Sequence, residues 1–155
     1  MGEAGKDALR VGFDRTIMLA FHGARVSSDA GLFPYRDLDE AAGLTTSGTS
    51  QLFDLRTGGN IQHSMTALLR QSIYSRLAGY EDVNDAQRLS VDPVMRHVVG
   101  GRAANRRAAS TSQVSRFETD VLVHPDNLAA LMNMPGQWVD SLTIPGSDFQ
   151  EGVTG

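Results

Sequence analysis

The stretch from Ser64 to Gly101 constrains the fold most, because it carries three helix start signals separated by very short connections. Ser64 can cap a first helix, and Gly79 stands where that helix would end. Between them apolar side chains recur every three or four residues, which predicts one inward face. That face carries Met65, Leu68, Leu69, Ile73 and Leu77, whereas the outward positions are Arg70, Gln71 and Arg76.

Two further helix starts follow within this stretch. Asp82 can cap a short second helix that ends near Leu89. Asp92-Pro93 predicts a third helix, because an N-cap oxygen followed by proline suits the first helical turn. Helices joined by such short links cannot lie far apart, so the stretch predicts a closely packed helical unit.

The segment before this unit combines strand and helix patterns. Residues 9–21 hold alternating apolar positions and strand-forming types, which predicts a small hairpin with a return strand at residues 25–27. Residues 36–42 predict a helix that turns Leu38 toward the core. Residues 45–50 are small and polar, so they predict a loop.

The segment after the unit predicts two more helices. Residues 102–109 are basic and small, which favours a mobile connection. Ser110 can cap a helix that runs through Thr119. Pro125 can start another, which Pro135-Gly136 would break, and its inward residues would be Leu128, Leu131 and Met132.

These elements predict a mainly α fold, a compact multi-helix domain with a small N-terminal β-hairpin. Residues 1–24 would form a tail and the hairpin, residues 25–142 the helical region, and residues 143–155 a divergent C-terminal tail. The length of 155 residues and hydrophobic content of 41% suit a globular domain that buries about two thirds of its unfolded surface.

Composition excludes several kinds of site. The chain has no cysteine, which excludes disulfides and thiolate zinc sites. Its longest apolar run, residues 17–21, is too short to cross a bilayer, so we expect no membrane partner and a cytoplasmic location. The four histidines show no paired metal-ligand spacing, and we assign no metal or other cofactor to this chain. We expect His63 to pack or to cap the helix that starts beside it.

Acidic residues cluster at two places, Asp37-Asp39-Glu40 and Glu81-Asp82-Asp85. Acids near a helix start are stabilised by its positive end, and this explanation is favoured for both clusters. Acid clusters that hold two metal ions have the same appearance in a sequence.

Basic residues are distributed unevenly, although the net charge is −4. Residues 93–117 contain no Asp or Glu but five arginines, which are Arg96, Arg102, Arg106, Arg107 and Arg116. A local positive field can bind nucleic acid within an acidic protein, because screening makes neighbouring charges matter most. A solvated surface loop would show the same pattern.

The helix capped by Ser110 has residue types that suit a DNA major groove. Glutamine pairs with adenine edges and arginine with guanine edges. The candidate DNA-binding residues are therefore Arg102, Arg106 and Arg107 on phosphates and Ser112, Gln113, Ser115 and Arg116 on bases. On residue spacing alone, a capped surface helix without a ligand is favoured.

Several blocks in order carry a family resemblance. They are SSDAGLFPYRDLDEAAGL, LLRQSIYSRLAGYEDVNDAQRLSVDPVMRHVVG, ASTSQVSRFETDVL and NLAALMNMPGQWVDSL. Over residues 25–142 the chain resembles the N-terminal region of bacterial insertion-sequence transposases of the DDE type, in the group named insertion sequence thirteen-eighty. The blocks GYEDVND and SRFE are its most specific motifs.

The resemblance implies a DNA-binding and assembly region that precedes an RNase-H-like catalytic domain. In such a domain three acidic residues hold two divalent metal ions such as Mg²⁺. The sequence TIPGSDFQEGVTG after Leu142 departs from the family motif, so neither Asp140 nor Asp148 receives a catalytic role. We therefore expect a truncated transposase that binds terminal inverted repeats in DNA transposition and is inactive alone.

Two alternatives stay open. The chain could be a protein-interaction module that pairs with itself or with full-length transposase and inhibits it. It could also be a non-functional remnant of a mobile element.

Overall fold

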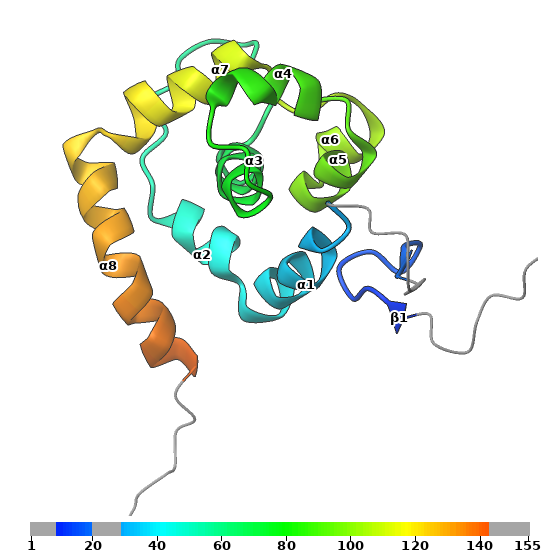
Figure 1. The fold of residues 1–155 in the computed structure, drawn as a ribbon. Coiled ribbons are helices and arrows are strands. Elements are labelled where there is room, and N and C mark those ends of the chain that lie inside the picture. The colour runs from blue at the N-terminus through cyan, green and yellow to red at the C-terminus, as the bar shows by residue number, and fades with distance from the viewer. Residues whose placement is uncertain (1–8, 20–28, 143–155) are drawn as a thin grey trace, which may run out of the picture.

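The computed structural model describes residues 9–19 and 29–142, and helices dominate them (Figure 1). Strand β1 (Leu9–Arg10) pairs antiparallel with β2 (Met18–Leu19), with Leu9 opposite Leu19. The predicted hairpin is therefore confirmed, but its return strand is β2. The return strand that we predicted at residues 25–27 lies outside the described residues.

Helix α1 (Leu32–Ala42) ends at Gly43, as predicted, and Gly43 has the positive φ of 64° that favours glycine there. The loop predicted for residues 45–50 is wrong, because α2 (Leu44–Ser50) follows at once. Its first turn is stabilised from α1, where the Asp39 carboxylate accepts the backbone N–H and the hydroxyl of Thr45. That contact between neighbouring helices outweighs the low helix propensity of the segment.

The cap interpretation of the first acidic cluster is also wrong, because α1 begins at Leu32 and the acids lie in its second half. Asp37 instead accepts the backbone N–H groups of Gly12 and Phe13, which fixes the hairpin segment on α1. Leu38, predicted to face the core, is 56% exposed.

Helix α3 (Met65–Leu77) lies in the middle of the other helices (Figure 1). Ser64 caps it as predicted, by accepting the N–H of Ala67. The predicted inward face is wrong in part, because Ile73 and Leu77 are exposed and Gln71 is buried. Gln71 is buried because α3 contacts α2, α5 and α7, so that its buried surface is wider than one stripe.

Three short elements follow: η1 (Val83–Asp85), α4 (Ala86–Leu89) and α5 (Pro93–Val99). Both predicted caps are confirmed. Asp82 accepts the N–H of Asn84, and Asp92 accepts the N–H of Met95.

The predicted mobile connection is wrong. Residues 102–105 form α6 (Arg102–Asn105), and the alanines of this segment are core residues, since Ala103, Ala108 and Ala109 are buried. The predicted Ser110 helix is confirmed as α7 (Thr111–Arg116), which continues into the π-helix η2 (Phe117–Leu122).

The last helix, α8 (Pro125–Leu142), runs through Pro135, so the predicted break is wrong. Proline removes one backbone donor from the helix, and that loss alone does not end it here. Leu128 and Met132 are exposed rather than inward; the buried residue is Asn127, whose amide bonds the backbone of Phe53 and Val121. None of the described helices is long and apolar enough to span a membrane.

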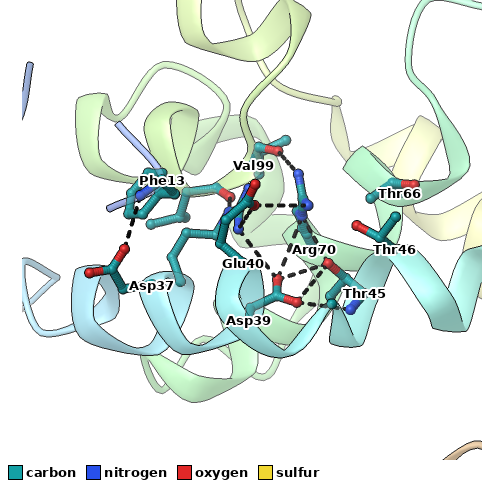
Figure 2. Close-up of polar contacts among 12 residues, drawn as sticks. Phe13, Asp37, Asp39, Glu40, Thr45, Thr46, Thr66, Arg70 and Val99 are labelled. Atoms are coloured by element: carbon teal, nitrogen blue, oxygen red, sulfur yellow. Dashed lines mark hydrogen bonds and ion pairs between the residues drawn. The ribbon is translucent and has the colours of Figure 1, made fainter. Parts of the chain in front are cut away.

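A buried polar network joins α1, α2, α3 and α5 (Figure 2). Asp39 lies 3.6 Å from the Arg70 guanidinium and accepts the Tyr74 hydroxyl. Burial, together with the Asp39 charge, raises the pKa of Tyr74. Arg70 also donates to the Val99 carbonyl, and Arg36 to that of Val98, so the network fixes the end of α5.

Candidate nucleic-acid interface

Three adjoining depressions, which we call the basic groove, lie beside α6 and α7. The first, of about 480 Å³, is lined by five of the seven candidate residues: Arg102, Arg106, Arg107, Ser112 and Gln113. The second, of about 370 Å³, is lined by Arg116 and Gln113, and the third, of about 330 Å³, by Arg102. They adjoin because Gln62 and His63 line all three.

The four candidate arginines, Arg102, Arg106, Arg107 and Arg116, are all exposed, and none makes an ion pair with any described residue. Other arginines are occupied, for example Arg76 on Glu118 and Arg88 on Asp85. An unpaired guanidinium keeps its donors available for phosphate or guanine, whereas an ion-paired one would have to give up a partner first.

Arg96 belongs to the same acid-free window, but it has a structural position. Its guanidinium donates to the carbonyls of Ala103 and Ala104, at 3.0 and 3.2 Å, at the end of α6. Together with the turn at Gly100 and Gly101, both at positive φ, this contact fixes the direction in which α6 leaves α5. The window therefore divides into one supporting arginine and four exposed ones.

The candidate residues on helix α7 differ in their exposure and in their hydrogen bonds. Ser112 and Arg116 are exposed one turn apart and share a face. The Gln113 side-chain oxygen accepts the N–H of Ser110 at 2.9 Å, so it closes the N-terminus of the helix. Ser115 is half-buried and lines none of the three depressions. The structure thus brings six of the seven candidates together and leaves Ser115 apart.

The residues of the groove that were missed from the sequence include Arg56, Gln62 and His63. All three precede the arginine window by about 30 residues or more, and no local pattern marks them. Arg56 binds Asp54 through a two-pronged ion pair and donates to the His63 carbonyl at 2.6 Å. Burial lowers the pKa of His63, and the charges of Arg102 and Arg56 lower it further.

Acidic residues do not converge on a metal site in the part of the chain that the structure describes, where no group of three His, Asp or Glu side chains could hold an ion. Asp39 and Glu40 are neighbours, but Arg36 and Arg70 lie against both carboxylates. The described residues therefore do not fit a two-metal centre, and we derive no catalytic step from them.

Comparison with known proteins identifies the family. A family model described as Transposase DDE domain group 1 matches residues 9–147, which is most of the chain. Searches of curated proteins and of solved structures gave no match. The family match confirms the resemblance to DDE transposases that the sequence blocks carried. The chain belongs to the transposase DDE domain group 1 family.

Proposed function

We propose that the basic groove binds DNA at the ends of a mobile element, and that residues 25–142 are the DNA-binding and assembly region of a transposase of the insertion sequence thirteen-eighty group. One observation carries this proposal: four exposed arginines without acidic partners surround one groove in a chain of a transposase family. Guanidinium groups suit phosphate geometry, and phosphate contacts dominate protein–DNA affinity. The proposed partner is the terminal inverted repeat.

The arginines divide into two roles. Arg102, Arg106 and Arg107 lie on and just after α6 and bind phosphates, which fixes the position of the duplex. Arg116 projects from α7 and binds a guanine edge, with Ser112 and Ser115 nearby on the same helix. Recognition of adenine by glutamine uses both the side-chain oxygen and the side-chain NH₂ group. The Gln113 oxygen already accepts the Ser110 N–H, so Gln113 offers DNA only its NH₂ donor.

The proposal is limited to DNA binding. Strand cleavage and transfer would need three converging carboxylates with two divalent ions, and the described residues hold no such set.

The test is a titration of the purified chain with labelled duplexes of the terminal repeat and of a scrambled sequence, at several salt concentrations. Three phosphate contacts predict a logarithmic salt slope of about −2.7, since each contributes about −0.9. No binding to the repeat at low salt would overturn the proposal.

Two variants test the division of roles. Arg106→Gln should weaken binding to both duplexes alike and bring the slope about 0.9 closer to zero. Arg116→Gln should reduce the preference for the repeat by about 1–3 kcal/mol. The matched control is Arg88→Gln, which removes the same charge from an exposed arginine paired with Asp85 outside the groove. Equal losses for all three variants would contradict the assignment.

A second candidate function, pairing with another copy or with full-length transposase, is favoured by the outer face of α8. Exposed apolar residues recur there at alternating steps of four and three, namely Leu128, Met132, Pro135, Val139 and Leu142. This is the spacing of a coiled-coil seam, which can pack against an identical helix. Self-association through α8 is compatible with DNA binding, because none of these residues lines the basic groove.

A further inference from the structure

His63 occupies the point where the three depressions of the basic groove meet. It directly precedes Ser64, the N-cap of α3, and Arg56 holds its carbonyl. The residue is only 7% exposed. Its backbone is therefore fixed on both sides while its ring borders the groove.

No hydrogen bond joins the His63 imidazole to another described residue, and its ring nitrogens are not among the fully buried, unpartnered polar atoms, so they keep access to the groove that His63 lines. A largely buried imidazole whose nitrogens reach a groove and have no protein partner is free to donate a hydrogen bond to a ligand there. His97 provides the contrast, because its Nδ1 lies 2.6 Å from the carbonyl of Pro93 in its own helix and is occupied.

The charges around His63 indicate the charge of the ligand that could bind there. The arginines that line the groove with it are Arg56, Arg70, Arg102, Arg106, Arg107 and Arg116. Arg56 is paired with Asp54, and Arg70 with Asp39 and Glu40, so the unpaired positive charges are those of Arg102, Arg106, Arg107 and Arg116. The opposing charge on the wall of the second depression is Asp120. The N-terminal end of α3 adds further positive potential. An anion is the ligand that this environment favours.

We propose that His63 donates a hydrogen bond to a backbone phosphate of DNA at the centre of the basic groove, and that it takes up a proton from solvent as the phosphate binds. The proposal rests on the proposed function of the groove. In the free protein the lowered pKa keeps His63 neutral at neutral pH. A phosphate oxygen beside the ring stabilises the charged form and raises that pKa, so binding is linked to protonation.

The sign of the pH effect follows from this linkage. Because the complex holds His63 with the higher pKa, DNA affinity should rise as the pH falls from about 8 to about 6. Calorimetric titration of the full chain with one defined duplex, in two buffers of different ionisation enthalpy, should register proton uptake.

His63→Gln should bind the same duplex about tenfold more weakly and should lose the proton uptake, since glutamine can donate but cannot titrate. His97→Gln is the matched control and should keep both properties, because His97 lines none of the three depressions. Equal affinity and equal proton uptake in wild type and His63→Gln would overturn the proposal while leaving DNA binding intact.

A second measurement avoids the variant altogether. The imidazole resonances of wild-type His63, followed by NMR during a pH titration, should report a higher pKa in the DNA complex than in the free chain. An unchanged titration overturns the proposal even if His63→Gln fails to fold. Absence of any DNA binding by the wild type overturns this proposal and the proposed function together.

Discussion

Both the NH₂ group and the oxygen of the Gln71 side chain form hydrogen bonds with one residue that is distant in the sequence. Its Nε2 donates to the Ala109 carbonyl and its Oε1 accepts the Ala109 N–H, each at 2.8 Å and fully buried. Ala109 follows Arg106 and Arg107 closely, so this pair of bonds helps to fix the segment that carries them. Helical periodicity predicted an outward Gln71 because the residue is polar. The periodicity contains no information on its partner, which lies 38 residues further along the chain.

Replacing Gln71 with methionine, which has a similar shape, should lower the free energy of unfolding by about 2–6 kcal/mol. Both backbone groups of Ala109 would then be buried without partners, at about 1–3 kcal/mol each. Urea denaturation followed by circular dichroism measures the loss. Gln87→Met, at an exposed position, should change the free energy by less than about 0.5 kcal/mol. Equal effects of the two substitutions would show that the Ala109 bonds are unimportant.

The candidate site could be predicted in part at this scale. Arginines without nearby acids are rarely buried, so the window itself indicated that Arg102, Arg106, Arg107 and Arg116 lie on the surface. It could not separate Arg96, whose role depends on the carbonyls at the end of α6. His63 was predicted only to pack or to cap α3, because its position beside the groove arises only when the loop before α3 meets α6 and α7.

At the scale of elements, the start of a helix was more predictable than its extent. Caps at Ser64, Asp92 and Ser110 depend on residues a few positions apart, and all three are confirmed as helix starts. The errors at α2 and along α8 have another origin. The start of α2 is stabilised by Asp39 of a different helix, and α8 is placed by Asn127 through backbone groups of Phe53 and Val121. Such tertiary contacts are absent from local patterns.

Glu118 connects η2, to which it belongs, with α3. Its carboxylate accepts hydrogen bonds from Ser72 and Arg76 of α3. Hydrogen bonds from Arg76 lower its pKa, although burial opposes them. The stabilisation should therefore be complete above the ordinary pKa of 4.5 and be lost as the pH falls through the lowered folded value.

Glu118→Gln should accordingly reduce the free energy of unfolding by about 1 kcal/mol at pH 7, and the difference from wild type should disappear in acid. Urea denaturation at a series of pH values measures both. Glu81→Gln removes an equal charge from an exposed position and should leave stability nearly unchanged at every pH. A difference for Glu118→Gln that persists in strong acid would contradict the ion-pair explanation.

For the whole molecule, the net charge of −4 does not show where positive and negative side chains lie on the surface. Acidic side chains are used as caps, in the interior network and in ion pairs, while unpaired arginines gather at the basic groove. The mainly α fold was predictable because periodicity and caps recur along the chain. The arrangement of helices around α3 (Figure 1) was not, because it depends on polar contacts between distant segments.

Self-association is the prediction that belongs to this scale. If α8 pairs with a second copy, sedimentation of the chain should show a dimer that forms as concentration rises. Met132→Glu, at a residue that is 76% exposed, should abolish the dimer and leave binding of one chain to DNA unchanged. Asp140→Asn, a polar change elsewhere on the same helix, should retain it. A monomer at all concentrations would exclude this pairing.

Asn127 connects α8 to the segment that leads to the basic groove. Its amide clamps the first turn of α8 to the chain at Phe53, and that same loop continues through Arg56 to His63. A displacement of α8 would therefore be passed through Phe53 to the segment that forms part of the groove wall. Asn127, together with the Gln51–Gln137 hydrogen bond, thus connects the position of α8 to the segment that leads to the groove.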